Sequence, residues 1–134
     1  MKKHSNEITT IDPILSAVRK IRDESTDKNR AQVLRDVETE RIRQIEKWGE
    51  QNWPMAPKKI GMNGTPTAEY YGWQADRFRA FNNRTKDKTW HDILCEEVAE
   101  VFAETEPEKQ REEMVQVAAV AVQIIEYLDR KRKI

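Results

Sequence analysis

Carboxylates occupy the apolar side of one predicted helix, in the segment from Trp90 to Phe102. With about 100° of rotation per residue, Glu97 falls in the middle of the apolar stripe, Glu100 falls at its margin, and Glu96 lies farther round. The stripe consists of Trp90, Ile93, Leu94, Val98 and Val101. A carboxylate that faces a core is unfavourable unless it is paired, hydrogen-bonded or bound to a metal ion. This segment therefore requires either a metal ion or a basic side chain from a neighbouring helix, and it does not decide between them.

The last predicted helix carries a further acid beside apolar residues. Gln116 follows Glu113 one helical turn later. The apolar neighbours of Glu113 are Val117, Val120 and Ile124. Because apolar residues cover a broad face from Met114 to Leu128, the sequence predicts a largely buried central helix. A hairpin at Glu106–Pro107 would set this helix antiparallel to the preceding one, so we expect the carboxylates of the two helices to face one another.

The kind of ligand atom in these positions favours a particular class of metal ion. Three or four oxygen ligands without histidine or cysteine favour a hard cation such as Mg²⁺, with Mn²⁺ as a second candidate. Mg²⁺ is typically held by a few carboxylates together with waters and substrate phosphates, which points to nucleotide chemistry. The predicted metal ligands are Glu97, Glu100, Glu113 and Gln116.

A mixed polar and aromatic face is expected on an earlier helix. Val37, Glu40, Arg41, Gln44 and Trp48 recur at spacings of three and four residues, so they share one side. An indole can stack on a nucleobase, and the amide of Gln44 offers a donor and an acceptor to a base edge. Arg41 or Lys47 could meet phosphates. The predicted substrate-binding residues are therefore Glu40, Arg41, Gln44, Lys47 and Trp48, although core packing of Trp48 is an equally good interpretation.

The spacing of apolar residues and helix breakers predicts an all-α chain, a helical bundle with little β-structure. The predicted helices cover about residues 13–24, 30–48, 67–81, 89–105 and 107–131, with a turn at 25–29 and a loop at 50–67. We expect Gly49 to end the second helix in the left-handed conformation. Residues 1–10 are expected to form a flexible arm, and residues 11–134 a single all-α domain.

Composition argues against several classes of function. The chain has 24 basic and 24 acidic side chains, whereas a sequence-independent nucleic-acid-binding protein normally shows a basic excess. Its one cysteine, Cys95, permits no intrachain disulfide or zinc cluster and has no evident basic partner. No apolar run approaches the roughly 18 residues of a membrane-spanning helix, and no signal-peptide pattern is present. We expect a soluble, cytoplasmic homo-oligomer that binds neither nucleic acid nor a membrane.

Two separated blocks of the sequence resemble the all-α nucleotide pyrophosphohydrolases, the superfamily of MazG, the dimeric dUTPases and the dCTP pyrophosphatases. Glu97-x-x-Glu100, a spacer of twelve residues and Glu113-x-x-Gln116 resemble its pattern of Glu-x-x-Glu, a similar spacer and Glu-x-x-Asp. The stretches 93–101 and 112–121 look like the MazG-like proteins common in bacteriophages, and residues 40–51 are similar to the same group. The likeness covers about residues 37–52 and 89–128.

The resemblance implies a MazG-like helical bundle, assembled as a homodimer or homotetramer, that hydrolyses a nucleoside triphosphate to the monophosphate and pyrophosphate with Mg²⁺. Carried over by position, Glu97, Glu100 and Glu113 would be metal ligands. Glu96 would serve a second metal ion or orient water, so the predicted catalytic residues are Glu96 and Glu97. For a phage-encoded protein, the expected location is the host cytoplasm.

Gln116 departs from the superfamily pattern, because an amide offers a neutral carbonyl oxygen where the family has a charged aspartate. One alternative is therefore a catalytically inactive helical module that binds a nucleotide or a partner protein. Another is a structural oligomer whose buried glutamates pair with arginines such as Arg41 or Arg43. A stabilising effect of Mg²⁺ would distinguish metal binding from the purely structural alternative.

Overall fold

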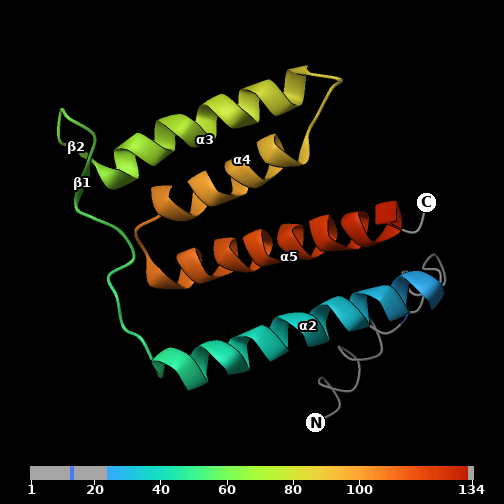
Figure 1. The fold of residues 1–134 in the computed structure, drawn as a ribbon. Coiled ribbons are helices and arrows are strands. Elements are labelled where there is room, and N and C mark those ends of the chain that lie inside the picture. The colour runs from blue at the N-terminus through green and yellow to red at the C-terminus, as the bar shows by residue number, and fades with distance from the viewer. Residues whose placement is uncertain (1–12, 14–23, 133–134) are drawn as a thin grey trace, which may run out of the picture. The chain divides into compact units, whose positions relative to one another are not determined.

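The structure is a computed structural model that describes residue 13 and residues 24–132. The described part is mostly helical, as the sequence predicts (Figure 1). Its elements are α2 (Glu24–Trp48), β1 (Lys59–Ile60), β2 (Thr65–Pro66), α3 (Thr67–Arg84), α4 (Trp90–Ala103) and α5 (Pro107–Arg132). Among these elements, no helix is long and apolar enough to cross a membrane.

Contacts divide the chain into two units, Met1–Arg41 and Ile42–Ile134, and we describe each by itself. The boundary falls inside α2. The predicted arm at residues 1–10 and nearly all of the predicted helix at 13–24 lie outside the described residues. The prediction that residues 11–134 form one domain stays a prediction.

Helix α2 confirms the predicted end but not the predicted start. The turn predicted at residues 25–29 is wrong, because α2 is already helical from Glu24. Serine, threonine and aspartate are common in turns, but they are also favoured at the start of a helix, so their presence was ambiguous. At the other end Gly49 has a φ of 67°, and its N–H donates to the carbonyl of Ile45 at 2.7 Å. This left-handed glycine ends the helix as predicted.

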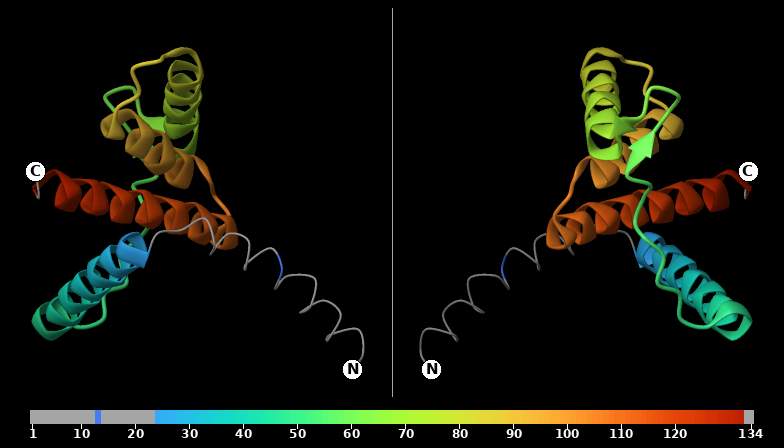
Figure 2. Two further views of the ribbon diagram at one scale, coloured as in Figure 1. Left: turned by 90° about the vertical axis from the view of Figure 1, so that its right-hand side faces the viewer. Right: turned by 90° about the vertical axis from the view of Figure 1, so that its left-hand side faces the viewer.

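The segment predicted as a loop contains a short β-hairpin that holds the start of α3. Strands β1 and β2 pair antiparallel, and the turn between them uses Gly61 and Gly64 at φ values of 78° and 64°. The Thr67 N–H donates to the carbonyl of Lys58 at 3.1 Å, and the Thr67 hydroxyl donates to the carbonyl of Pro57. Figure 2 shows the two strands beside the first turns of α3.

Helix α4 lies between α3 and α5, and consecutive helices run antiparallel (Figures 1 and 2). Ala75 of α3 and Ala99 of α4 are both buried, and small side chains allow two helices to approach closely. The ring centroids of Tyr71 and Phe102 are 5.3 Å apart. Val101 of α4 and Val120 of α5 are buried as well. The core of this unit is therefore thin and centred on α4.

Helix α3 ends three residues later than predicted. Asn82 and Asn83 were expected to end α3, but it continues to Arg84 because the Asn82 side chain finds interior partners on α4.

The prediction of a largely buried α5 is wrong for this chain. Met114 is 40% exposed, Val115 53% and Leu128 49%. The apolar residues extend around more of the helix than one neighbouring helix can cover.

Two glycines provide a matched test of this backbone. Gly49→Ala should lower the free energy of unfolding by about 1–2 kcal/mol, because alanine is strained at a positive φ. Gly72→Ala, inside α3, should raise it by about 0.5–1 kcal/mol, since the added methyl group meets no atom within 4 Å. Urea unfolding of both variants measures the two effects. If both substitutions changed the free energy of unfolding in the same direction, the result would contradict the assigned backbone conformations.

Candidate metal centre

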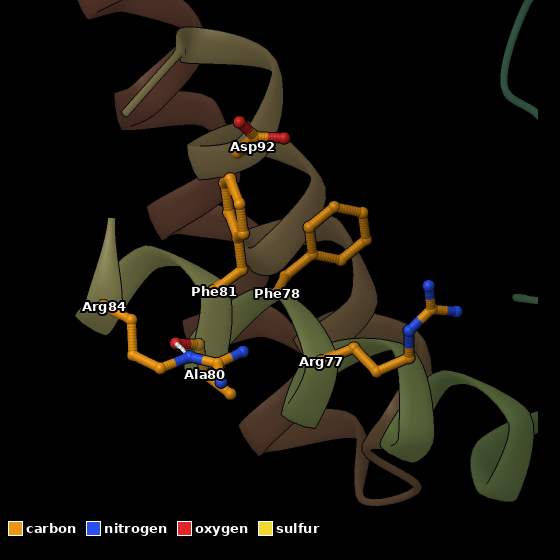
Figure 3. Close-up of a pocket in the computed structure, with 6 residues that line it drawn as sticks. All are labelled: Arg77, Phe78, Ala80, Phe81, Arg84 and Asp92. Atoms are coloured by element: carbon orange, nitrogen blue, oxygen red, sulfur yellow. Dashed lines mark hydrogen bonds between the residues drawn. The ribbon is translucent and has the colours of Figure 1, made fainter. Parts of the chain in front are cut away.

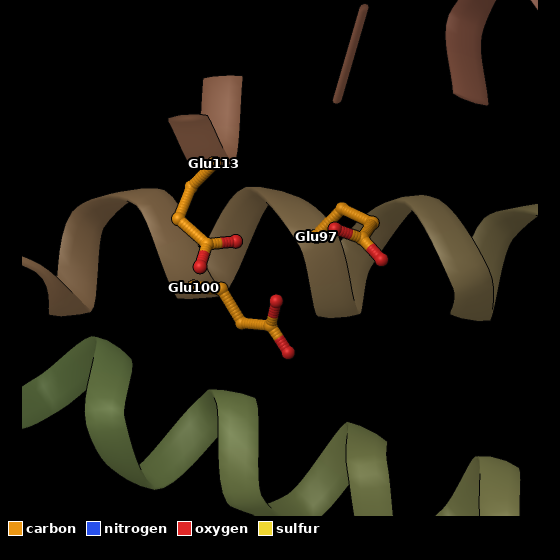
Figure 4. Close-up of side chains that lie close together, drawn as sticks. All are labelled: Glu97, Glu100 and Glu113. Carbon is orange, nitrogen blue, oxygen red and sulfur yellow. The ribbon is translucent and has the colours of Figure 1, made fainter. Parts of the chain in front are cut away.

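Three carboxylates converge where α4 contacts α5. Glu97 and Glu100 are one turn apart on α4, and Glu113 comes from the first half of α5. One oxygen from each lies within 4.8 Å of the others, and Figure 4 shows the three side chains close together beside α4. The antiparallel hairpin therefore brings together the three acids that the sequence predicts to face one another. We call Glu97, Glu100 and Glu113 the carboxylate cluster.

The carboxylate cluster contains more negative charge than its surroundings neutralise. Glu97 Oε2 and Glu113 Oε2 are buried and have no hydrogen-bond partner in the described structure. Burial raises the pKa of Glu97, and repulsion from Glu100, Glu96 and Glu113 raises it further. Burial likewise raises the pKa of Glu113, together with the charge of Glu100 and a hydrogen bond to it. Each of these effects disfavours the ionised form, which a nearby cation would favour.

Helix α3 contributes two side chains that the sequence analysis did not identify. Arg79 Nη2 donates to Glu100 Oε1 at 3.0 Å, and its Nη1 donates to Asp76 Oδ1 at 3.0 Å. The hydrogen bond to Glu100 is the main cause of a raised pKa of Arg79. The available signal was the spacing of Asp76, Arg79 and Asn82, which recur every three residues on one side of α3.

Asn82 holds the neighbouring acid Glu96 in place. Its Nδ2 donates to Glu96 Oε1 at 2.9 Å and to the carbonyl of Asp92 at 3.2 Å. The residue is only 6% exposed, so these bonds are shielded from water. Glu96, which the sequence analysis names as a catalytic candidate, therefore has one oxygen engaged by Asn82.

The residues of the carboxylate cluster fit a hard divalent cation. All their ligand atoms are oxygens, and the two buried oxygens without partners are the kind of group that a metal ion satisfies. Within the carboxylate cluster, Arg79 pairs with Glu100. Mg²⁺ or Mn²⁺ could use an oxygen of each carboxylate and take its remaining ligands from water or phosphate.

Gln116, the fourth predicted ligand, lies one turn beyond Glu113 on α5, and its side chain is exposed. It is not among the three acids that converge. The role of Gln116 as a metal ligand stays a prediction.

The predicted substrate-binding residues all lie on the second half of α2. Glu40 and Gln44 are half-buried, Arg41 is exposed, and Lys47 Nζ lies 4.9 Å from the centre of the Trp48 ring. Trp48 is 54% exposed in the described structure. Because the unit boundary crosses α2, the assignment of these residues to a nucleotide stays a prediction.

A cavity of about 450 Å³ opens between α3 and the start of α4. It is lined by Arg77, Phe78, Ala80, Phe81, Arg84 and Asp92, which Figure 3 shows. No member of the carboxylate cluster lines it, and both oxygens of Asp92 are engaged by Thr89 and His91. Volume alone does not identify a reactive site, so the carboxylate cluster and not this cavity is the candidate functional site.

The single cysteine has a basic neighbour that the sequence analysis missed. His91 Nε2 lies 3.5 Å from Cys95 Sγ, as expected for residues one turn apart on a helix. At about 100° per residue, Cys95 lies on nearly the opposite side of α4 from Glu97. This pair is therefore separate from the carboxylate cluster.

The chain matches no protein-family model, no curated protein and no solved structure. The geometry of the site and the sequence pattern of its residues therefore provide the grounds for a function.

Glu97→Gln should stabilise the metal-free protein, because it removes a buried charge that repels its neighbours. At pH 7 we expect the Tm to rise by about 3–5 °C, the equivalent of about 1 kcal/mol for a domain of this size. In the parent, a folded-state pKa above the ordinary 4.5 means that the folded state binds more protons than the unfolded state just above pH 4.5. The parent should therefore lose stability as the pH rises through that window, whereas the variant should lose less.

Thermal unfolding in chelator from pH 4.5 to 7 measures both effects. Glu108→Gln is the matched control, because Glu108 is exposed in the first turn of α5, away from the carboxylate cluster. A Glu97→Gln variant less stable than the parent at pH 7 in chelator would show that the charge of Glu97 stabilises the fold.

Proposed function

We propose that this chain is a Mg²⁺-dependent nucleotide pyrophosphohydrolase that converts a nucleoside triphosphate to the monophosphate and pyrophosphate. The observation that supports it is the convergence of Glu97, Glu100 and Glu113, two of which have a buried oxygen without a hydrogen-bond partner among the described residues. An all-oxygen site of this kind suits Mg²⁺, which commonly binds protein carboxylates and substrate phosphates together. The resemblance of the sequence pattern to MazG-like proteins supports the same reaction.

In this proposal Glu97, Glu100 and Glu113 hold the divalent cation. When bound, the cation would neutralise charge on the phosphate oxygens and make a water more acidic. The three carboxylates come from two packed helices, so their positions are set by the backbone and need little rearrangement. The repulsion between them in the metal-free protein favours occupation of the site.

Glu96 is the proposed proton acceptor. Asn82 donates to Glu96 Oε1, which leaves Oε2 free of that hydrogen bond and available to a water. A carboxylate with a fixed orientation can accept a proton from an attacking water as the bond to phosphorus forms. In this role Asn82 is a positioning residue, since it acts through Glu96.

The structural alternative accounts for only part of the carboxylate cluster. Arg79 pairs with Glu100, as that alternative requires of one glutamate. Glu97 Oε2 and Glu113 Oε2 have no such partner in the described residues, although burial makes a partner most necessary there. The metal interpretation accounts for all three acids, and we favour it for that reason.

We further propose that the chain acts as a homodimer or homotetramer and that the exposed face of α2 contributes to nucleotide recognition. Met114, Val115 and Leu128 of α5 are 40–53% exposed, which leaves apolar surface for a second copy to cover. On α2, the exposed Trp48 offers an aromatic face for a base, and Gln44 offers an amide.

Hydrolysis provides the direct test. A panel of ribo- and deoxynucleoside triphosphates, incubated with Mg²⁺, should yield a monophosphate and pyrophosphate, and chelator should abolish the reaction. Glu97→Gln and Glu113→Gln should each lower kcat/KM at least about 100-fold, because each removes a charged ligand. Glu108→Gln should retain the parent's activity.

Product chromatography separates monophosphate from diphosphate and so identifies the bond that is cleaved. A folded parent that binds Mg²⁺ but cleaves no triphosphate of the panel would support the inactive nucleotide-binding module instead.

Gln116→Asp should tighten Mg²⁺ binding about threefold to tenfold, because it adds a carboxylate at an exposed position of α5 one turn from Glu113. In the parent, Mg²⁺ at about 100 times its Kd should raise the Tm by about 8–13 °C. Calorimetric titration and thermal unfolding measure these effects. If Mg²⁺ did not change the Tm of the parent, the structural alternative would be supported. An unchanged Mg²⁺ affinity in Gln116→Asp would place position 116 outside the metal site.

A further inference from the structure

Arg79 brings a positive charge to the solvent edge of the carboxylate cluster. Its Nη2 donates to Glu100 Oε1, and its Nη1 donates to Asp76 Oδ1, both at 3.0 Å. The Arg79 side chain is 47% exposed and that of Glu100 is 20% exposed. Figure 4 shows the carboxylate of Glu100 directed towards α3, the helix that carries Arg79. The guanidinium group thus has one partner on its own helix and one partner in the cluster.

The two partners of Arg79 differ in what else they can bind. Asp76 is 76% exposed, lies three residues before Arg79, and faces water. Glu100 belongs to the carboxylate cluster, in which one oxygen each of Glu97, Glu100 and Glu113 lies within 4.8 Å of the others. A divalent cation held by these three acids would approach the guanidinium group, and two cations at one carboxylate repel each other. Binding of such a cation would therefore weaken the ion pair between Arg79 and Glu100.

Release from Glu100 would leave Arg79 anchored beside the site. The bond to Asp76 connects positions i and i+3 of one helix and does not involve the cluster. The freed end of the guanidinium group would carry N–H donors in a planar fork, which matches the oxygens of a phosphate. A polyphosphate bound to the cation would bring such oxygens to the edge where Arg79 stands.

We propose that Arg79 is an exchangeable counter-ion: it pairs with Glu100 in the metal-free protein and moves to a phosphate of the substrate when the cation binds. This inference rests on the proposed function, and it adds a residue of α3 to the polyphosphate site. A permanent ion pair that only fastens α3 to α4 is the competing explanation, and it predicts no contact with phosphate.

The first test measures Mn²⁺ binding to the metal-free protein by calorimetry, with no nucleotide present. Arg79→Gln should bind Mn²⁺ about threefold to fivefold more tightly than the parent, because the competing surface ion pair is gone. Arg79→Lys should lie between the two, because it keeps the charge but loses the fork. The matched control is Arg77→Gln, which removes the same charge from an exposed position of α3 that lines the separate cavity.

The second test titrates the manganese complex of pyrophosphate into the manganese-saturated protein. Pyrophosphate carries the phosphate chemistry without a base, so the assay does not depend on nucleotide preference. Arg79→Gln should bind it about tenfold more weakly than the parent, because a charge-assisted hydrogen bond is lost. Arg77→Gln should bind it as the parent does. Far-UV circular dichroism confirms that each variant is folded.

Opposite changes in one variant, tighter Mn²⁺ and weaker pyrophosphate, support the exchange. Unchanged or weaker Mn²⁺ binding by a folded Arg79→Gln variant overturns it. Tighter Mn²⁺ with unchanged pyrophosphate overturns it as well, since Arg79 would then leave Glu100 without reaching a phosphate. A parent that binds no Mn²⁺ contradicts the proposed function itself and removes this inference with it, so the two failures are distinguishable.

Discussion

The mutual repulsion of three carboxylates is the constraint on which this site depends. Glu97, Glu100 and Glu113 are held close together by the packing of α4 against α5, although burial and like charge both oppose their ionisation. Packing can impose such an arrangement only if the helices cannot slide apart to relieve it. The rest of the unit is best understood as the means by which α4 is fixed in place.

Each side of α4 is fixed by a different kind of contact. Towards α3, the approach through Ala75 and Ala99 is close, and Asn82 adds two shielded hydrogen bonds. Towards α5, the contact is mainly apolar, with Val101 and Val120 buried. At its start, the Thr89 hydroxyl accepts from the N–H of Asp92 at 3.2 Å and thereby caps the first turn. Hydrogen bonds on the α3 side and apolar packing on the α5 side together restrict the movement of the carboxylate cluster.

Local periodicity predicted the helices and three members of the site, and tertiary contacts decided the rest. Glu97 and Glu100 could be found because an acid in an apolar stripe is visible in one helix. The spacing of Arg79 and Asn82 places them on one side of α3, but their importance comes from facing α4, and the sequence does not say which side of α3 does so. The predicted burial of α5 was too extensive for a related reason. Apolar residues show which surface could be covered, but the number of neighbouring helices is a property of the assembled fold.

Asn82 has a consequence for how freely the connection between α3 and α4 can vary in length. It binds both the Asp92 carbonyl and the Glu96 side chain, so the last turn of α3 contacts the first turns of α4 directly through hydrogen bonds. Lys86, Asp87 and Lys88 are exposed in that segment, and surface connections tolerate added residues well. Insertions there are thus a route by which the surface of the molecule can diversify while the spacing of its acids stays constant.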